Sequence, residues 1–216
     1  MFHRLLVVLG GAVLAAVLTS SALAAVHVRV RVEGAHTTIF GASERRLTPV
    51  TGTFQPPGGV SVTVSGQTAF GALERASRLG EFFYHVSSTS FGPYVDQIGR
   101  RLAAGSTGWV FKVNNVSPPV GADAVKLRKG DRVLWYFARF GASGGPKTLD
   151  LAKAGPGCYR AYAYDDNGAR TSPARVTFER DGRFVGSMSG RLCPHGSWHE
   201  LRALKKGMVR SDAIAR

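Results

Sequence analysis

The stretch GWVFKVNNVSPPVGADAVKLRKGDRVLWYF, residues 108–137, holds the two clearest strands of the chain and the turns between them. Residues 109–114 predict a strand that ends at Asn114 and Asn115, because asparagine tolerates the left-handed backbone of a tight turn. Residues 132–138 predict a second strand, since large apolar and aromatic side chains recur there with the period of two that strands require. The most informative part of the sequence therefore indicates β-structure.

Aromatic side chains concentrate in these two strands. Alternation places Trp135 and Phe137 on one face of their strand and Tyr136 on the other. We expect Trp135 and Phe137 to pack in the core, where aromatic rings bury large areas. Tyr136 and Trp109 are the candidates for contact with a ligand or partner, with core packing as the alternative for both.

The turn residues offer a second set of candidates. Asn114, Asn115 and the Ser117-Pro118-Pro119 loop carry hydrogen-bonding groups that a ligand would use. The alternative is turn chemistry alone, because asparagine suits a left-handed turn and proline stiffens loops. Turn chemistry is the simpler interpretation.

One helix interrupts the predicted strands. Residues 68–79 place the apolar positions 70, 73, 76 and 79 on one face. Thr68 is the expected N-cap, and Gly80 stands where a left-handed C-terminal stop belongs. Glu74 and Arg78 form an i,i+4 pair that we expect on the solvent side.

Alternating valines predict further strands at 26–33 and 60–65, the first with one buried face. Strands with a helix packed on them indicate an α+β domain, which we place at 25–140. Residues 141–147 begin Gly-Ala-Ser-Gly-Gly, a composition typical of a flexible linker.

The last part of the chain, residues 148–216, consists of short apolar runs and glycine turns. One turn, Lys205-Lys206-Gly207, has strand-like residues 201–204 and 208–214 on its two sides. Short strands with turns roughly every 8–12 residues predict a small β-sandwich. The fold class expected for the whole chain is therefore mainly β with one helix, an α+β domain followed by an all-β sandwich.

Residues 108–137 also resemble the signature of a known family, a bacterial domain of unknown function similar to the C-terminal domain of transcobalamin and intrinsic factor. The resemblance extends back through Thr68-Ala-Phe-Gly-Ala-Leu-Glu and Phe91-Gly-Pro-Tyr-Val-Asp-Gln-Ile, and it covers about residues 26–140. It implies a β-grasp-like fold and an exported protein. Residues 146–216 resemble immunoglobulin-like or prealbumin-like sandwich modules, which usually act as spacers or adhesion units.

In the vitamin carriers of this family, cobalamin lies between this domain and a large helical barrel. The 216 residues contain no segment that suits such a barrel, so half of a cobalamin site is missing. The resemblance implies a ligand-binding face without naming its ligand. We therefore predict no cofactor, and a corrinoid stays open as a ligand that no residue of the sequence supports.

The first 24 residues have the layout of a signal peptide. A short basic start precedes an apolar run, 5–18, which is shorter than the roughly 20 residues that span a membrane. Small residues at Ala22 and Ala24 indicate cleavage between Ala24 and Ala25. We expect a secreted or envelope protein with no stable membrane span after cleavage, an uncleaved anchor being the alternative.

The net charge of +14 suggests an anionic partner, but the excess is spread over both halves of the chain. Arginine outnumbers lysine in an alanine- and glycine-rich sequence, which favours a bias of composition over a dedicated basic site. Nucleic acid is therefore not an expected partner. Loose attraction to anionic polymers of the cell surface stays open.

The two cysteines, Cys158 and Cys193, are expected to form a disulfide in an oxidising compartment. His195 and His199 follow Cys193 with a spacing that a metal site would tolerate. Because Cys158 is a ready partner for Cys193, we predict no metal. A metal-binding or hydrolytic protein built on Cys193, His195 and His199 is the third of three functional hypotheses.

Motifs of the common enzyme classes are absent from the sequence, including the nucleophile elbow, the zinc-protease helix and the phosphate-binding loop. We expect no enzyme. The leading hypothesis is a secreted binding module for a small molecule, a glycan or a surface protein. The second is a structural or adhesion module without a small-molecule site.

Overall fold

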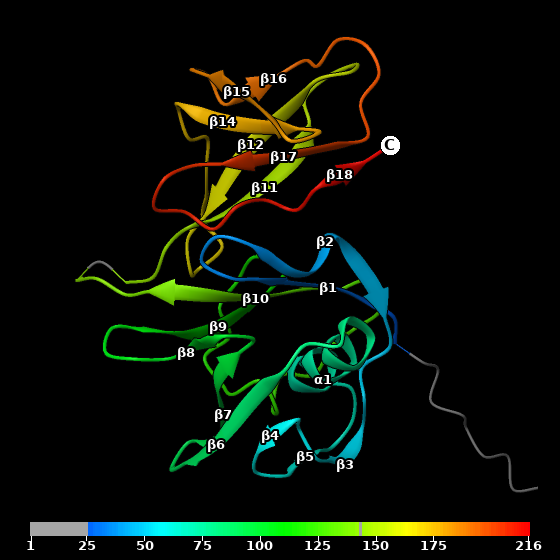
Figure 1. The fold of residues 1–216 in the computed structure, drawn as a ribbon, viewed down its shortest axis with the longest axis vertical. Helices are drawn as coiled ribbons and strands as arrows, with labels where there is room; N and C mark the ends of the chain where they lie inside the picture. Colours follow the sequence, from blue (N-terminus) through cyan, green and yellow to red (C-terminus); the bar gives the residue numbers. More distant parts are fainter. Residues whose placement is uncertain (1–25, 143) are drawn as a thin grey trace, which may run out of the picture.

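The computed structural model describes residues 26–142 and 144–216 (Figure 1). Over these residues the protein is mainly β with a single helix, which confirms the predicted fold class. The elements of the first part are β1 (Val28–Glu33), β2 (Thr38–Leu47), β3 (Gly52–Phe54), β4 (Gly58–Gly59), β5 (Val62–Val64), α1 (Ala69–Gly80), β6 (Tyr84–Thr89), β7 (Gly92–Ile98), β8 (Arg101–Leu102), β9 (Thr107–Val113) and β10 (Arg132–Arg139). The predicted cleavage site at Ala24 and Ala25 lies outside the described residues.

The central sheet has the order β2-β1-β10-β9. β1 and β10 are parallel neighbours in its middle, and β2 and β9 pair with them in antiparallel fashion. A parallel pair requires a long crossover connection. Here the crossover contains α1, the small sheet β4-β6-β7-β8 and the two-stranded ribbon of β3 and β5.

Helix α1 covers one face of the central sheet (Figure 1). Thr68 caps its start as predicted, because the Thr68 hydroxyl accepts a hydrogen bond from the Gly71 amide at 3.1 Å. The left-handed C-cap is Glu81, however, and not Gly80. Gly80 is the last helical residue, where a Cβ atom would meet the Phe40 ring at 2.6 Å. Close packing, and not a left-handed backbone, therefore requires glycine at position 80.

Glu74 is buried, contrary to the expectation that it faces solvent. Its carboxylate accepts hydrogen bonds from Arg78 Nε at 2.5 Å and from the hydroxyl of Tyr84 on β6. Burial, followed by the bond to Glu74, raises the pKa of Tyr84 above its usual value. The helical pattern alone does not reveal that a strand covers this side of the helix.

The C-terminal part contains β11 (Thr148–Lys153), β12 (Tyr159–Tyr164), β13 (Arg170–Thr171), β14 (Val176–Arg180), β15 (Arg183–Ser187), β16 (Arg191–Leu192), β17 (Glu200–Leu204) and β18 (Ile214–Ala215). They form two sheets, β11-β12-β13 with β16 beside β12, and β15-β14-β17-β18. Phe178, Leu201 and Trp198 belong to an apolar cluster shared by the two sheets. Of the predicted strand 208–214, only its last residue lies in a strand, because Val209 bridges to Thr148 instead.

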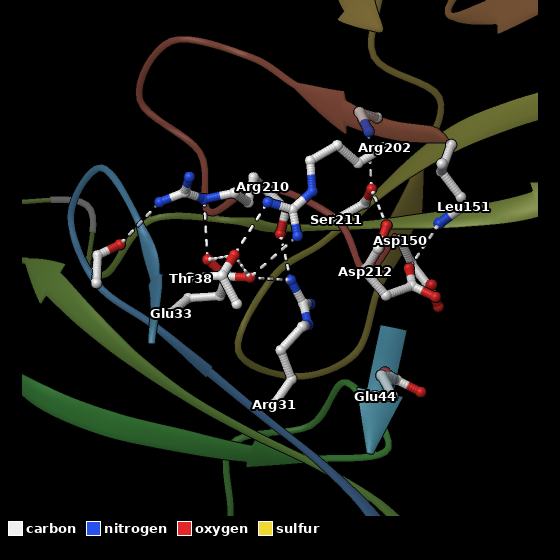
Figure 2. Close-up of polar contacts among 12 residues, drawn as sticks. Arg31, Glu33, Thr38, Glu44, Asp150, Leu151, Arg202, Arg210, Ser211 and Asp212 are labelled. Carbon is white, nitrogen blue, oxygen red and sulfur yellow. Dashed lines mark hydrogen bonds and ion pairs between the residues drawn. The ribbon is translucent and has the colours of Figure 1, made fainter. Parts of the chain in front are cut away.

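The second face of the central sheet is also buried, against the C-terminal sheets (Figure 1). The prediction of one buried face for residues 26–33 is therefore wrong, since Arg31 and Glu33 are 2% and 0% exposed. Glu33 accepts from Arg31 Nη1 at 3.0 Å and from Arg210 Nε at 2.8 Å (Figure 2). Burial of these charges is tolerated because opposite charges meet at hydrogen-bonding distance.

A second ionic cluster centres on Arg132 of β10. Its guanidinium donates to Glu44 at 2.7 Å and to both Asp150 oxygens, at 2.6 Å and 2.9 Å. Asp212 lies next to Asp150, 3.8 Å from Arg132. Burial, and then the charge of Asp150, raise the pKa of Asp212 to about 7. For Asp150 the effect of burial is outweighed by the hydrogen bond and charge of Arg132, so its pKa lies below the usual value.

The segment 141–147, predicted as a flexible linker, joins two parts that are in contact. Within it, Gly141 and Gly144 exchange backbone hydrogen bonds, and Ser143 lies outside the described residues. Lys112 of β9 is 1% exposed and donates to the Asp165 carbonyl at 2.7 Å, which adds a further contact between the two parts. The linker composition therefore does not imply separated domains here.

Candidate functional site

An aromatic cavity of about 310 Å³ lies beside the outer edge of β9. Its lining comes from α1, β7, β9, β10, the loop after β9 and two later positions: Phe70, Pro93, Tyr94, Val95, Trp109, Val110, Phe111, Ser117, Pro118, Gly121, Ala122, Trp135, Tyr136, Phe140 and Asp166. Among the described strands, β9 pairs along its length only with β10. The aromatic cavity therefore occupies the place that a further strand would take.

The turn after β9 gives the aromatic cavity its second wall. Asn114 and Asn115 both have left-handed backbones, with φ of 51° and 69°, and Val113 and Val116 bridge across them. The chain then returns along the cavity through Ser117 and Pro118. The left-handed turn at Asn114 and Asn115, expected from the sequence, therefore reverses the chain so that Ser117 and Pro118 line the cavity.

Trp109, one of the two predicted contact residues, lines the aromatic cavity but is only 1% exposed. Its indole Nε1 donates to the Arg101 carbonyl at 2.8 Å, and its ring meets Phe137 edge-on at 5.4 Å. The hydrogen bond to Arg101 and the ring contact with Phe137 hold the indole as a fixed wall of the cavity.

Tyr136, the other predicted contact residue, reaches the same cavity from the opposite face of its strand. It is 1% exposed and shares the cavity lining with Ser117. Burial, followed by the negative charge of Asp166, raises the pKa of Tyr136 above its usual value. The phenol therefore stays neutral at physiological pH.

The polar end of the aromatic cavity is formed by Ser117 and Asp166. The Ser117 hydroxyl donates to Asp166 Oδ1 at 3.1 Å, and Lys112 Nζ lies 3.3 Å from the same oxygen. Burial lowers the pKa of Lys112, although the charge of Asp166 opposes that shift. A ligand would therefore meet an apolar chamber with hydrogen-bonding groups at one end.

Asn114 and Asn115 do not line the aromatic cavity. The Asn114 amide donates to Asp131 and its oxygen accepts from the Arg132 amide, at 2.8 Å and 2.9 Å. Asn115 donates to Asp150 at 3.3 Å. Their side chains thus hold the turn and the ionic cluster, and a contact with a cavity ligand is not available to them.

Sequence reasoning missed two aromatic side chains of the cavity lining, Tyr94 and Phe140. Tyr94 has a side chain that is 38% exposed and lies in β7, far from the motif in sequence. The signal in the sequence was the family resemblance, which includes Tyr94 within Phe91-Gly-Pro-Tyr-Val-Asp-Gln-Ile.

The predicted disulfide between Cys158 and Cys193 is confirmed. In the disulfide, Cys193 Sγ is bonded to Cys158 and is not free to bind a metal. The His199 side chain is 91% exposed to solvent. In the part of the chain that the structure describes, no cluster of potential metal ligands occurs. The disulfide therefore leaves Cys193 without the free thiolate that a site built on Cys193, His195 and His199 requires.

The comparison with protein families matches residues 66–139 to a family described as a domain of unknown function. Residues 66–139 are a DUF4430 domain. The DUF4430 domain contains α1 and β6 to β10, and with them every residue of the cavity lining except Phe140 and Asp166. The finer resemblance to transcobalamin is not confirmed. No curated protein matches the chain.

The described residues include no helix that is long and apolar enough to cross a membrane. The disulfide is compatible with an extracellular protein, because such bonds persist in oxidising compartments.

Proposed function

We propose that this protein is a non-enzymatic binding module outside the cytoplasm, and that its ligand is a small apolar group held in the aromatic cavity. The observation that carries the proposal is a chamber of about 310 Å³ walled by aromatic rings inside the DUF4430 domain. Small-molecule sites are typically concave and mostly apolar, with a few polar groups that set orientation. Ser117 and Asp166 are the polar groups here.

The size of the aromatic cavity limits the ligand. Typical ligand pockets have volumes of roughly 300–1,000 Å³, and this one lies at the small end of that range. A whole corrinoid is far larger than such a chamber encloses. The ligand is therefore a small planar or branched apolar molecule, or the apolar end of a larger one, with a hydrogen-bond donor directed at Asp166.

The test uses a variant that fills the aromatic cavity and a neighbour that does not. Pro118 lines the cavity, whereas Pro119 is exposed and does not. N-phenyl-1-naphthylamine, a neutral dye that fluoresces in apolar sites, is titrated into the wild type, Pro118→Trp and Pro119→Trp. We expect binding by the wild type and Pro119→Trp, and at least a tenfold weaker affinity for Pro118→Trp.

Two controls accompany this titration. Circular dichroism and thermal unfolding establish that both variants fold, and quenching of Trp109 and Trp135 fluorescence by the dye gives a second readout from within the cavity. Equal binding by the two variants, or no binding by the wild type, contradicts the proposal.

A second candidate function is a structural or adhesion module. It is favoured by the burial of Trp109 and Tyr136, each 1% exposed, and by the ionic contact between the two parts of the chain. Such a module predicts no dye binding in the cavity, so the same titration separates the two functions.

A further inference from the structure

A second hollow of about 860 Å³ lies between the two parts of the chain and shares no residue with the aromatic cavity. We call it the basic groove. Its basic side chains are His36, Arg101, Arg139, Lys205, Lys206 and Arg210. No carboxylate side chain is among the described residues that line it. Because the lining contains six basic side chains and no acidic one, the electrostatic potential in the basic groove is positive.

The cations of the basic groove differ from the buried arginines nearby. Arg31, Arg132 and Arg202 are each within 4.0 Å of a carboxylate. Arg101 and Arg139 form no ion pair with any described carboxylate, and both are exposed. Their charge is therefore available to an external anion.

Lys205 and Lys206 supply the opposite wall, from the turn after β17. Lys206 is exposed and, like Arg101 and Arg139, forms no ion pair with any described carboxylate. Lys205 Nζ donates to the Ala174 carbonyl at 2.7 Å, and this bond positions the ammonium without neutralising its charge. Arg210 is the exception in the groove, because its guanidinium is already in an ion pair with the buried Glu33 carboxylate at 2.8 Å. The free charges thus come from both parts of the chain and face one hollow.

We propose that the basic groove binds a strand of acidic polysaccharide, whose carboxylate or sulfate groups pair with Arg101, Arg139 and Lys206. This inference is independent of the proposed function of the aromatic cavity. Arginine is suited to such anions because its planar fork pairs with two oxygens at once. The apolar floor, which includes Leu204 and Met208, offers a surface for the less polar faces of sugar rings.

Other polyanions fit the basic groove less well. Single-stranded nucleic acid is usually held by bases stacked on open aromatic rings. Phe137 is the aromatic residue of this lining, and its ring already contacts the Arg101 guanidinium at 5.8 Å and the Trp109 ring at 5.4 Å. The walls are mainly turns and strand ends, at Gly34, Arg139 and Gly207, so an acidic peptide finds no open strand edge to extend.

The experiment compares two variants with equal loss of charge. Arg101→Gln/Arg139→Gln/Lys206→Gln removes the free cations of the basic groove. Arg128→Gln/Lys129→Gln/Lys153→Gln removes three exposed cations that do not line it. Each protein, with its disulfide intact, is titrated with fluorescent heparin and oligogalacturonate chains, and with a fluorescent oligothymidylate, at 50 and 300 mM NaCl.

We expect the wild type to bind at least one of the two polysaccharides, with the sulfated and carboxylated chains showing which anion is preferred. The groove variant should lose at least tenfold in affinity, because it lacks the cations that contact the polysaccharide. The matched control should lose less than about threefold, because it shares only the reduced net charge, whose effect salt screens. Equal losses would assign binding to net charge alone and overturn the inference. It is overturned as well if no polysaccharide binds, or if oligothymidylate binds as tightly and is lost in the same variant.

Discussion

The two faces of the central sheet are buried by different physical means. On the face toward α1, Val28, Val30 and Val32 meet an apolar cluster, and stability comes from area removed from water. On the opposite face, Arg31 and Glu33 of the same strand are buried in a network of opposite charges. The comparison teaches that strict alternation identifies a strand without showing whether its polar face reaches solvent.

The largest effect is expected from removing the acid at the centre of the charged face. Glu33→Ala leaves Arg31, Arg202 and Arg210 with no central partner, and breaking a buried ion pair in this way costs about 3–5 kcal/mol. Urea unfolding measures the free energy. Glu200→Ala, at a side chain that is 50% exposed, is the matched control and should change it little.

The same strand allows a direct comparison with the apolar face. Val30→Ala removes two methyl groups from a fully buried side chain and should lower the free energy of unfolding by about 2–3 kcal/mol. If Val30→Ala proves more costly than Glu33→Ala in the same urea measurement, the charged face contributes less than the apolar one and the comparison fails.

A pH-dependent effect is expected from Asp212, at the edge of the charged face. In the folded chain, burial and then the charge of Asp150 raise the pKa of the Asp212 carboxyl from its ordinary value of 3.8 to about 7. The resulting stabilisation is complete below about pH 4 and is lost as the pH rises through 7. Asp212→Asn, which cannot ionise, should gain up to about 4 kcal/mol relative to the wild type between pH 4 and pH 8.

Urea unfolding of both proteins at several pH values measures this difference. A constant difference between wild type and Asp212→Asn from pH 4 to pH 8 would show that Asp212 does not carry the pH dependence. The depressed pKa of Asp150 acts in the opposite sense, since its stabilisation is lost as the pH falls, and it is present in both proteins.

The strands of residues 108–137 and the helix after Thr68 were predictable because periodicity and capping are local properties of the chain. The errors at Glu74 and Gly80 share one cause. Both depend on a neighbour from another element, Tyr84 or Phe40, whose approach no local pattern reveals. The candidate site was found only in part for the same reason, since Tyr94 and Asp166 join it from distant segments.

The sequence by itself determined the mainly β class, the single helix and the cysteine pairing, because these follow from side-chain period, capping chemistry and the presence of only two thiols. The tertiary structure alone decided which charges are buried, and where the aromatic cavity and the basic groove lie. Arg31 donates to the Arg210 carbonyl, 179 residues away in the sequence, and Arg132 donates to the Glu44 carboxylate, 88 residues away. These contacts form only when distant segments of the chain pack together.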